Sequence, residues 1–447
     1  MASNDDSESY DKTSISSIYS FALALTGKSL AEVVELPKDI VNVKNRGDLG
    51  RLVEKYYFKH TPPNNHDPDF KDAHLELKVT GVVKGSSGSL KAKERLVLTN
   101  IDYELIATES WNDNYFRRKC ETMLILFYLY SKESLVIDQK FVLKPKIYEF
   151  LKLHEVVIRD DWLTIQEKVL EGKAHELSEG DTFYLKACRK GPGGPLEKGR
   201  KQPFSQQLAK TRAFSLKQGF LTSIIENHEL EGGSLFNSQS DNLVDATYKR
   251  LMAFQGTSIG QISDQFKFYK IGTNQKGFYS NLTSRMLTNG QNVVRELDMS
   301  DVRIKTIRRH KGKKPKESMS FPNFDFIGIL NEKWEDSKFA IQLEQKFLFV
   351  VFETGEDGIE RFVGAKYWNM PYQDRQLAKL VWEETKRRVA INAHDLPKSS
   401  ESTVAHVRPK ARNRADTALT PQGDMHTKQC FWLNSSYIAK VLTEIKL

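Results

Sequence analysis

The pattern of apolar and polar positions along the chain predicts a mixture of strands and helices. Residues 123–128 are apolar throughout, which is typical of a central strand buried on both faces. Residues 74–80 alternate between polar and apolar, as expected for a strand with one buried face. Residues 160–173 and 17–36 have the spacing of amphipathic helices. We therefore expect the mixed α/β class, with sheets flanked by helices.

Short segments of the first half recur in the same order in the second half. The apolar strand 123–128 is matched by residues 347–352, and Trp162 of the predicted helix is matched by Trp382. The remaining matches pair Gly27–Leu30 with Gly256–Ile259, Asn45–Gly47 with Gln275–Gly277, Cys188–Lys190 with Arg408–Lys410, and Phe214–Leu216 with Phe431–Leu433. Ordered matches of this kind indicate two copies of one fold. We expect a first domain at residues 1–230, a linker at 231–250 and a second domain at 251–447.

Composition narrows the class of protein. The 447 residues include 67 Lys and Arg against 58 Asp and Glu, a net charge of +9 that is compatible with nucleic acid or another anionic partner. Three widely separated cysteines do not suggest a disulfide framework or a thiolate metal site. No apolar run approaches the roughly 20 residues of a membrane span, and the first residues are acidic and polar, unlike a signal peptide. These features favour a cytoplasmic protein with no membrane partner.

The segment from Lys186 to Lys217 is strongly basic. It contains nine Lys and Arg, including Arg189 and Lys190, and a single acidic residue, Glu197. A strand that runs into a basic, glycine-rich loop is suited to phosphate contacts in a DNA groove. A flexible basic loop without a ligand explains the same composition equally well.

Candidate chemistry lies at the start of the alternating strand. Glu76 and Lys78 share one face of this strand, and Asp69, seven residues before Glu76, can fold back beside them. Two carboxylates that hold Mg²⁺ and a lysine that serves the attacking water form a set suited to phosphodiester hydrolysis. A charged surface strand is the simpler alternative. Glu54 and the basic stretch ending at Lys119 are further candidates, with a solvated helix and a positive loop as their alternatives.

The second copy provides a test of this motif. Alignment of residues 74–79 with 302–307 retains a lysine, Lys305, but Arg303 replaces the glutamate. Glu296 falls where Asp69 would be, and Ser284 is the best match for Glu54. A cation in place of a metal-binding carboxylate should abolish metal binding. We expect the second copy to bind but not to cut.

In combination these motifs resemble a known family. Gly47–Glu54, Asp69 with Glu76–Lys78, and Trp111–Lys119 resemble the successive active-site motifs of MutH, the GATC-specific mismatch-repair nicking endonuclease. Val407–Ala411 with Asn413 resembles its base-reading segment. The two-copy layout is similar to the larger type II restriction endonucleases of the Sau-three-A-one type, whose MutH-like halves are one catalytic and one inactive. Glu176–Gly180 and Lys316–Phe321 also resemble segments of that family.

The resemblance implies a fold, an activity and roles for residues. The family belongs to the PD-(D/E)xK nucleases, with a mixed sheet flanked by helices. The resemblance implies cleavage of double-stranded DNA at the palindrome GATC, before the G, leaving 5′ overhangs. By position, Asp69 and Glu76 hold Mg²⁺, Lys78 serves the attacking water, and Glu54 and Lys119 complete the site. The further DNA-binding candidates are Lys190, Arg189, Arg408 and Lys410. The first copy departs from the nicking enzyme at Cys188 and Arg189, where that enzyme has arginine and proline.

One catalytic site per chain imposes a further expectation. A palindrome presents two equivalent strands, so a double-strand break requires two chains on the DNA, a homodimer, or two successive nicks. The alternative activities are strand nicking in repair and DNA binding without catalysis. The second copy disfavours a monomeric nickase, and the intact Asp69, Glu76 and Lys78 disfavour a regulator that does not cut.

Overall fold

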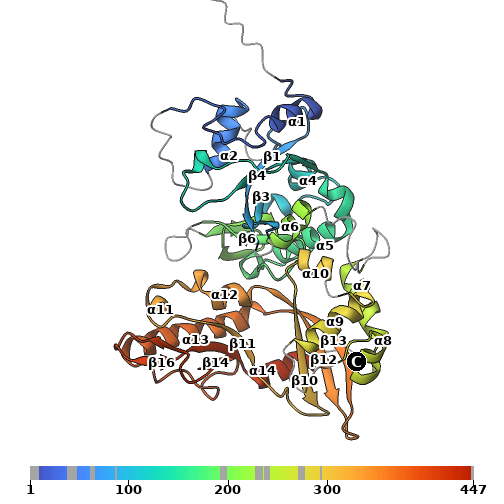
Figure 1. Cartoon of the computed structure of the whole chain (residues 1–447), viewed down its shortest axis with the longest axis vertical. Helices are drawn as coiled ribbons and strands as arrows, with labels where there is room; N and C mark the ends of the chain where they lie inside the picture. Colours follow the sequence, from blue (N-terminus) through green and yellow to red (C-terminus); the bar gives the residue numbers. More distant parts are fainter. Residues whose placement is uncertain are drawn as a thin grey trace, which may run out of the picture. The chain divides into compact units, whose positions relative to one another are not determined.

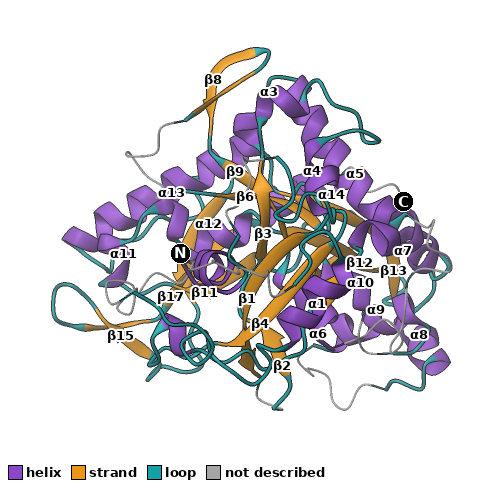
Figure 2. Cartoon of the chain, turned by 90° about the horizontal axis from the view of Figure 1, so that it is seen from above, coloured by secondary structure: helices purple, strands orange, loops and turns teal. Residues whose placement is uncertain are grey.

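The computed structural model describes residues 10–37, 48–60, 66–85, 88–191, 199–226, 235, 242–269, 277–291 and 294–443. The chain forms two compact units. Unit 1 comprises Met1–Ala174, Tyr184–Arg189 and Lys201–Glu231, and unit 2 comprises His175–Phe183, Lys190–Arg200 and Gly232–Leu447. Each unit combines sheets with flanking helices, so the expected mixed α/β class is confirmed (Figures 1 and 2). None of the helices in the described ranges has the length and apolar character needed to cross a membrane.

The N-terminal half of the chain contains two main sheets. Its elements are α1 (Ile15–Leu23), α2 (Asp48–Leu52), η1 (Val53–Tyr57), β1 (Glu76–Lys84), β2 (Leu90–Ala92), β3 (Leu96–Asn100), α3 (Tyr103–Ile106), α4 (Tyr115–Cys120), β4 (Met123–Leu129), η2 (Val136–Asp138), β5 (Lys146–Tyr148), α5 (Phe150–Leu170), η3 (Ala174–Glu176), β6 (Leu185–Arg189), β7 (Arg200–Gln202), β8 (Ser205–Ala209), β9 (Arg212–Leu216) and α6 (Gln218–Glu226). The first sheet is mixed, with the order β2-β1-β4-β5 and a parallel β1–β4 pair. The second is antiparallel, with the order β3-β9-β6.

In the mixed sheet, alternate residues of β1 lie on opposite faces, one in the core and one carrying the charged side chains. Leu77 pairs with Leu124, and both pack in a core that includes Ile18 of α1. Glu76 pairs with Met123 and Lys78 with Ile125, so these side chains lie on the opposite face. The apolar alternation of β1 therefore fixes the face on which its charged residues meet.

The C-terminal half repeats this arrangement. Its elements are α7 (Leu243–Met252), α8 (Ile259–Gln265), α9 (Phe278–Thr288), α10 (Arg295–Met299), β10 (Arg303–His310), β11 (Met319–Asn323), α11 (Gly328–Asn331), η5 (Trp334–Asp336), α12 (Lys338–Leu343), β12 (Lys346–Thr354), β13 (Glu360–Asn369), α13 (Tyr372–Ile391), β14 (Ala405–Pro409), β15 (Thr417–Leu419), β16 (Met425–Thr427), β17 (Gln429–Leu433) and α14 (Ser435–Leu442). The mixed sheet β10-β12-β13 matches β1-β4-β5, and the antiparallel sheet β11-β17-β14 matches β3-β9-β6.

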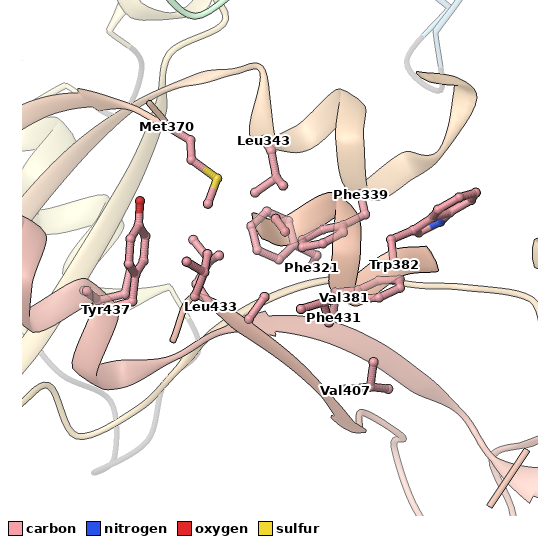
Figure 3. Packing of buried hydrophobic residues seen from close by; sticks show 14 of the residues in the cluster. Phe321, Phe339, Leu343, Met370, Val381, Trp382, Val407, Phe431, Leu433 and Tyr437 are labelled. Atoms are coloured by element: carbon pink, nitrogen blue, oxygen red, sulfur yellow. The ribbon is translucent and has the colours of Figure 1, made fainter. Parts of the chain in front are cut away.

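Individual contacts are repeated as well. Trp111 and Trp162 lie 5.9 Å apart between ring centroids, and Trp334 and Trp382 lie 5.8 Å apart. The core of unit 2 is aromatic around this second pair, where Phe339 stacks on Phe431 at 4.3 Å (Figure 3). Two units that share strand order and core contacts support the predicted duplication.

The structure refines several predicted boundaries. The apolar strand predicted from residue 123 is β4, buried on both faces as expected. The helix expected over residues 17–36 ends at Leu23 and is followed by turns, after which Gly27 takes a left-handed backbone (φ 83°) and its N–H donates to the Phe141 carbonyl. Helix α7 occupies most of the second half of the predicted linker, residues 231–250. The separate antiparallel sheets were not predicted, since short strands give weak periodicity.

A short segment from the first half of the sequence belongs to unit 2. Within His175–Phe183, the Asp181 carbonyl accepts a hydrogen bond from the Lys346 ammonium at 2.9 Å, and the Asp181 carboxylate accepts one from Asn369 at 2.8 Å. The Glu176 carbonyl accepts one from Arg375 at 2.7 Å. Unit 2 therefore includes residues from the first half of the sequence, whereas the pattern predicted a simple division at residues 230 and 250.

Candidate active site

A tight turn before β1 brings the two candidate metal-binding carboxylates together. Phe70 and Leu75 pair through two main-chain hydrogen bonds of 2.9 and 3.1 Å, and His74 makes the reversal with a left-handed φ of 50°. Asp69 and Glu76 flank this pair and become neighbours although they are seven residues apart. Both side chains are buried, with 5% and 1% of each residue exposed.

Hydrogen bonds hold the two carboxylates in fixed positions. Oδ2 of Asp69 accepts the Leu77 N–H at 2.8 Å, and Oε2 of Glu76 accepts the Asp69 N–H at 3.1 Å. Each carboxylate thus binds the main chain beside the other. A rigid pair of oxygen ligands needs little reorganisation when a cation binds.

Two lysines complete the charge distribution around Glu76. The Lys78 ammonium donates to Oε1 of Glu76 at 2.5 Å. The Lys119 ammonium lies 3.6 Å from Oε2 of Glu76 and donates to the Asp67 carbonyl at 2.9 Å. Lys119 is supplied by α4, whose N-cap Asn114 accepts the Arg117 N–H. The site therefore contains cations suited to a phosphate beside anions suited to a metal.

Glu54, in the π-helical turn η1, joins the same cluster electrostatically. Burial raises the pKa of Glu54 to about 7, and the Asp69 and Glu76 carboxylates add to the rise while Lys78 and Lys119 oppose it. Burial also raises the pKa of Glu76, against the effect of Lys78. For Lys78 burial is the largest single influence and favours the neutral amine, but Glu76, Cys120 and Asp69 together outweigh it and raise the pKa of the ammonium.

The donor set fits a divalent cation of the Mg²⁺ kind. Such ions bind proteins through one or two carboxylates and complete their shell with water and substrate phosphate. Asp69 and Glu76 supply two carboxylates, and their charges add to the effect of burial in raising the pKa of Glu54, a repulsion that a cation would relieve. Among the described residues there is no group of three or more Asp, Glu, His and Cys arranged to bind a metal by themselves. A small oxygen-ligand site that depends on water and phosphate is consistent with both observations.

Comparison with known proteins identifies the family to which the chain belongs. A family model described as "DNA mismatch repair enzyme MutH" matches residues 58–161, which include Asp69, Glu76, Lys78 and Lys119. The "Type II restriction enzyme Sau3AI" of Staphylococcus aureus is 31% identical over 489 aligned residues, covering 96% of this chain and 98% of that enzyme. This chain belongs to the Sau3AI-like type II restriction enzymes. The resemblance expected from the sequence motifs is confirmed, and the restriction-enzyme assignment makes the chain a site-specific deoxyribonuclease with a MutH-like nuclease domain.

The other candidate residues of this restriction enzyme lie on the antiparallel sheets. Arg189 is the last residue of β6, and Lys190 follows it with an exposed side chain. In unit 2, the Arg408 guanidinium lies over the Trp432 ring, 4.4 Å from its centroid. The Lys410 ammonium donates to the Phe321 carbonyl at 2.7 Å. These four cations do not take part in the carboxylate contacts around Glu76.

The turn before β10 reproduces the turn before β1. The Val302 N–H donates to the Leu297 carbonyl at 3.0 Å, as the Leu75 N–H donates to the Phe70 carbonyl, and Asp301 takes a left-handed φ of 47° like His74. This match places Glu296 at the Asp69 position, Arg303 at the Glu76 position and Lys305 at the Lys78 position. A letter-by-letter alignment of residues 74–79 with 302–307 is one residue out of this register.

Two contributors to the site were not found from the sequence. The Asp67 carbonyl fixes the Lys119 ammonium, and every residue has a carbonyl, so no sequence signal could mark this one. His60 donates its main-chain N–H to the Glu54 carbonyl at 2.9 Å and stacks on Phe70. A lone histidine between a helix and a turn carries no recognisable motif.

Proposed function

We propose that this restriction enzyme makes Mg²⁺-dependent double-strand breaks at 5′-GATC, cutting before the G and leaving 5′ overhangs, with catalysis in unit 1. The proposal is supported by the burial of Asp69 and Glu76 side by side, with two lysine ammonium groups on Glu76. The MutH-like match over residues 58–161 and the relationship to Sau3AI support the substrate class.

Each residue of the site has a distinct task in this proposal. Asp69 and Glu76 hold the metal, with Glu54 as a third acidic neighbour. A divalent cation held by these residues would supply Lewis-acid activation of the phosphate and the attacking water. Lys78 orients that water as a hydrogen-bond donor, because its contact with Glu76 keeps it protonated. Lys119 offsets the negative charge that grows on the phosphate in the transition state.

Sequence would be read from the end of β6. Lys190 is exposed there, and a lysine can donate to the O6 and N7 acceptors of guanine in the major groove. Arg189 precedes it and would contribute to base or phosphate contacts. Lys410 is the lysine that matches Lys190 in the second copy of the sequence; it directly follows β14, and Arg408 lies near it in the chain.

Unit 2 would promote cleavage without cutting. Arg303 replaces the metal-binding glutamate there, so a single chain offers one catalytic centre for two DNA strands. We propose that two chains act together on DNA and that unit 2 binds a second GATC site or the partner chain through Arg408 and Lys410. A variant with Arg408→Ala and Lys410→Ala should then lose its preference for plasmids with two sites over plasmids with one.

A plasmid digest tests the activity. Supercoiled DNA that contains GATC, incubated with the protein and Mg²⁺, should become linear, and sequencing of the ends should show cutting before the G. The variant Glu76→Gln, which keeps the shape of the side chain but lacks its charge, should leave the plasmid supercoiled. Open circles as the final product would instead indicate a nicking enzyme, and a gel shift without cleavage would indicate a DNA-binding regulator.

A further inference from the structure

Five positions of the proposed catalytic centre can be compared between the units. The matched turns relate Asp69, Glu76 and Lys78 to Glu296, Arg303 and Lys305. Glu54 matches Ser284, because α2–η1 and α9 each precede the turn and the strand of their own unit. Lys119 and Gln342 occupy matching positions in α4 and α12. Each of these helices is capped by a side chain that accepts the N–H of the residue three positions further on. The last relation is supported by a contact: Lys119 approaches Glu76, and Gln342 accepts a hydrogen bond from Arg303 at 2.7 Å.

The charge at these positions is inverted between the units. Unit 1 has three carboxylates and two ammonium groups, whereas unit 2 has two cations, two neutral side chains and one carboxylate. That carboxylate, Glu296, is 3% exposed and accepts the Leu235 N–H at 3.1 Å. The first arrangement needs a cation to offset its carboxylates, and the second has cations in excess.

Lys305 shows that the second arrangement needs an anion. Lys78 in unit 1 is bound to Glu76, but the half-buried Lys305 ammonium has no hydrogen-bond or ion-pair partner among the described residues. Burial lowers the pKa of Lys305, and the nearby charges of Arg303 and Lys410 lower it further. A half-buried ammonium beside two more cations is stabilised by an anionic ligand.

We propose that unit 2 binds one backbone phosphate of duplex DNA between Arg303 and Lys305, and that it needs no divalent cation to do so. This inference rests on the proposed function, in which unit 2 contacts DNA. A guanidinium and an ammonium at matching positions of the sheet would take the place of the metal that unit 1 requires. Arg303 is exposed and can present two N–H donors to the phosphate, and Lys305 adds a point charge from the same face of β10.

DNA binding in EDTA tests this inference. The full chain, mixed with a fluorescent duplex containing one GATC, should bind without metal. The variant R303Q/K305Q should bind about tenfold more weakly, and its plot of log affinity against log salt should be shallower by about 1, the loss of one phosphate contact. The control K379Q/R387Q removes two cations from α13 of the same unit, where both pair with glutamates, and should retain the parental affinity and slope.

A modified DNA keeps the test independent of any loss of stability. Replacing the charged phosphate 5′ of the G with a neutral methylphosphonate should lower the DNA affinity of the parent chain. The same replacement should hardly lower the already reduced affinity of R303Q/K305Q. Equal losses in both proteins, or parental binding of R303Q/K305Q in EDTA, would overturn the inference. The proposed function is judged separately by the Mg²⁺ digest: cleavage at GATC by the parent chain keeps that proposal standing even if this one fails.

Discussion

The Lys78 ammonium lies 2.5 Å from Oε1 of Glu76, and this contact keeps the lysine protonated. A lysine held as a cation is a poor base at neutral pH but a good donor to water or phosphate. We therefore predict that Lys78→Ala lowers the single-turnover cleavage rate by about 10²- to 10³-fold, the loss typical of one transition-state donor. Rapid-quench cleavage of a GATC duplex measures this rate.

The pH profile distinguishes the two roles of Lys78. If Lys78 acts as a donor, any rise of the cleavage rate toward pH 10 should persist in Lys78→Ala, because it reflects ionisation of the attacking water. A rise that follows deprotonation of a lysine and disappears in Lys78→Ala would contradict the donor role. Lys91→Ala is a matched control, since Lys91 is an exposed lysine on the neighbouring strand β2 and its removal should leave the rate unchanged.

Glu54 should make stability depend on pH. Its folded-state pKa of about 7 lies above the unfolded value near 4.5, so the stability is fully present below about pH 4.5 and is lost as the pH rises through 7. Glu54→Gln removes the buried charge and should increase the free energy of unfolding at pH 8 by about 1 kcal/mol, a figure discounted for partial exposure, with little gain at pH 5. Urea unfolding in EDTA at both pH values measures the difference, and an equal effect at both would refute this account.

Metal binding should be visible in thermal unfolding. Mg²⁺ at 100 times its dissociation constant should stabilise the parent by about 2.7 kcal/mol and raise its melting temperature, and EDTA should reverse the rise. Asp69→Asn and Glu76→Gln should melt at the same temperature with and without Mg²⁺. Glu296→Gln, the matched change in unit 2, should retain the Mg²⁺-dependent rise. The assignment of Asp69 and Glu76 as ligands fails if either variant responds like the parent.

Asp161 should be a purely structural carboxylate. It is 2% exposed and accepts the N–H groups of Tyr184 and Leu185 at 2.6 and 2.8 Å, which joins α5 to the start of β6. Asp161→Ala leaves two buried donors unpaired and should cost about 3 kcal/mol of stability in urea unfolding. Asp160→Ala, which removes a partly exposed ion pair with Arg159, should cost much less. Similar losses for both variants would show that the buried acceptor is not the cause.

The sequence predicted those parts of the molecule that depend on periodicity and on charge type. An unbroken apolar run identified β4, and alternation identified the face of β1 that carries Glu76 and Lys78. The duplication within one chain predicted that Arg303 replaces Glu76 in the second copy. The turn that brings Asp69 to Glu76 depends on a left-handed backbone at His74. A histidine in a sequence does not predict this conformation. The contact between Lys119 and the Asp67 carbonyl is likewise set by tertiary packing.

The assignment of His175–Phe183 to unit 2 has a consequence for the history and handling of the chain. A fragment that begins at residue 232 would lack the Asp181 and Glu176 carbonyls, so the buried Lys346 and Arg375 would each lose one hydrogen-bond acceptor. At Gly180 the unit 2 main chain comes so close that a Cβ would lie 2.8 Å from the Glu344 carbonyl oxygen. The two copies are therefore no longer interchangeable modules. We expect the C-terminal unit to depend for its stability on residues 175–183, which are synthesised with the N-terminal half of the chain.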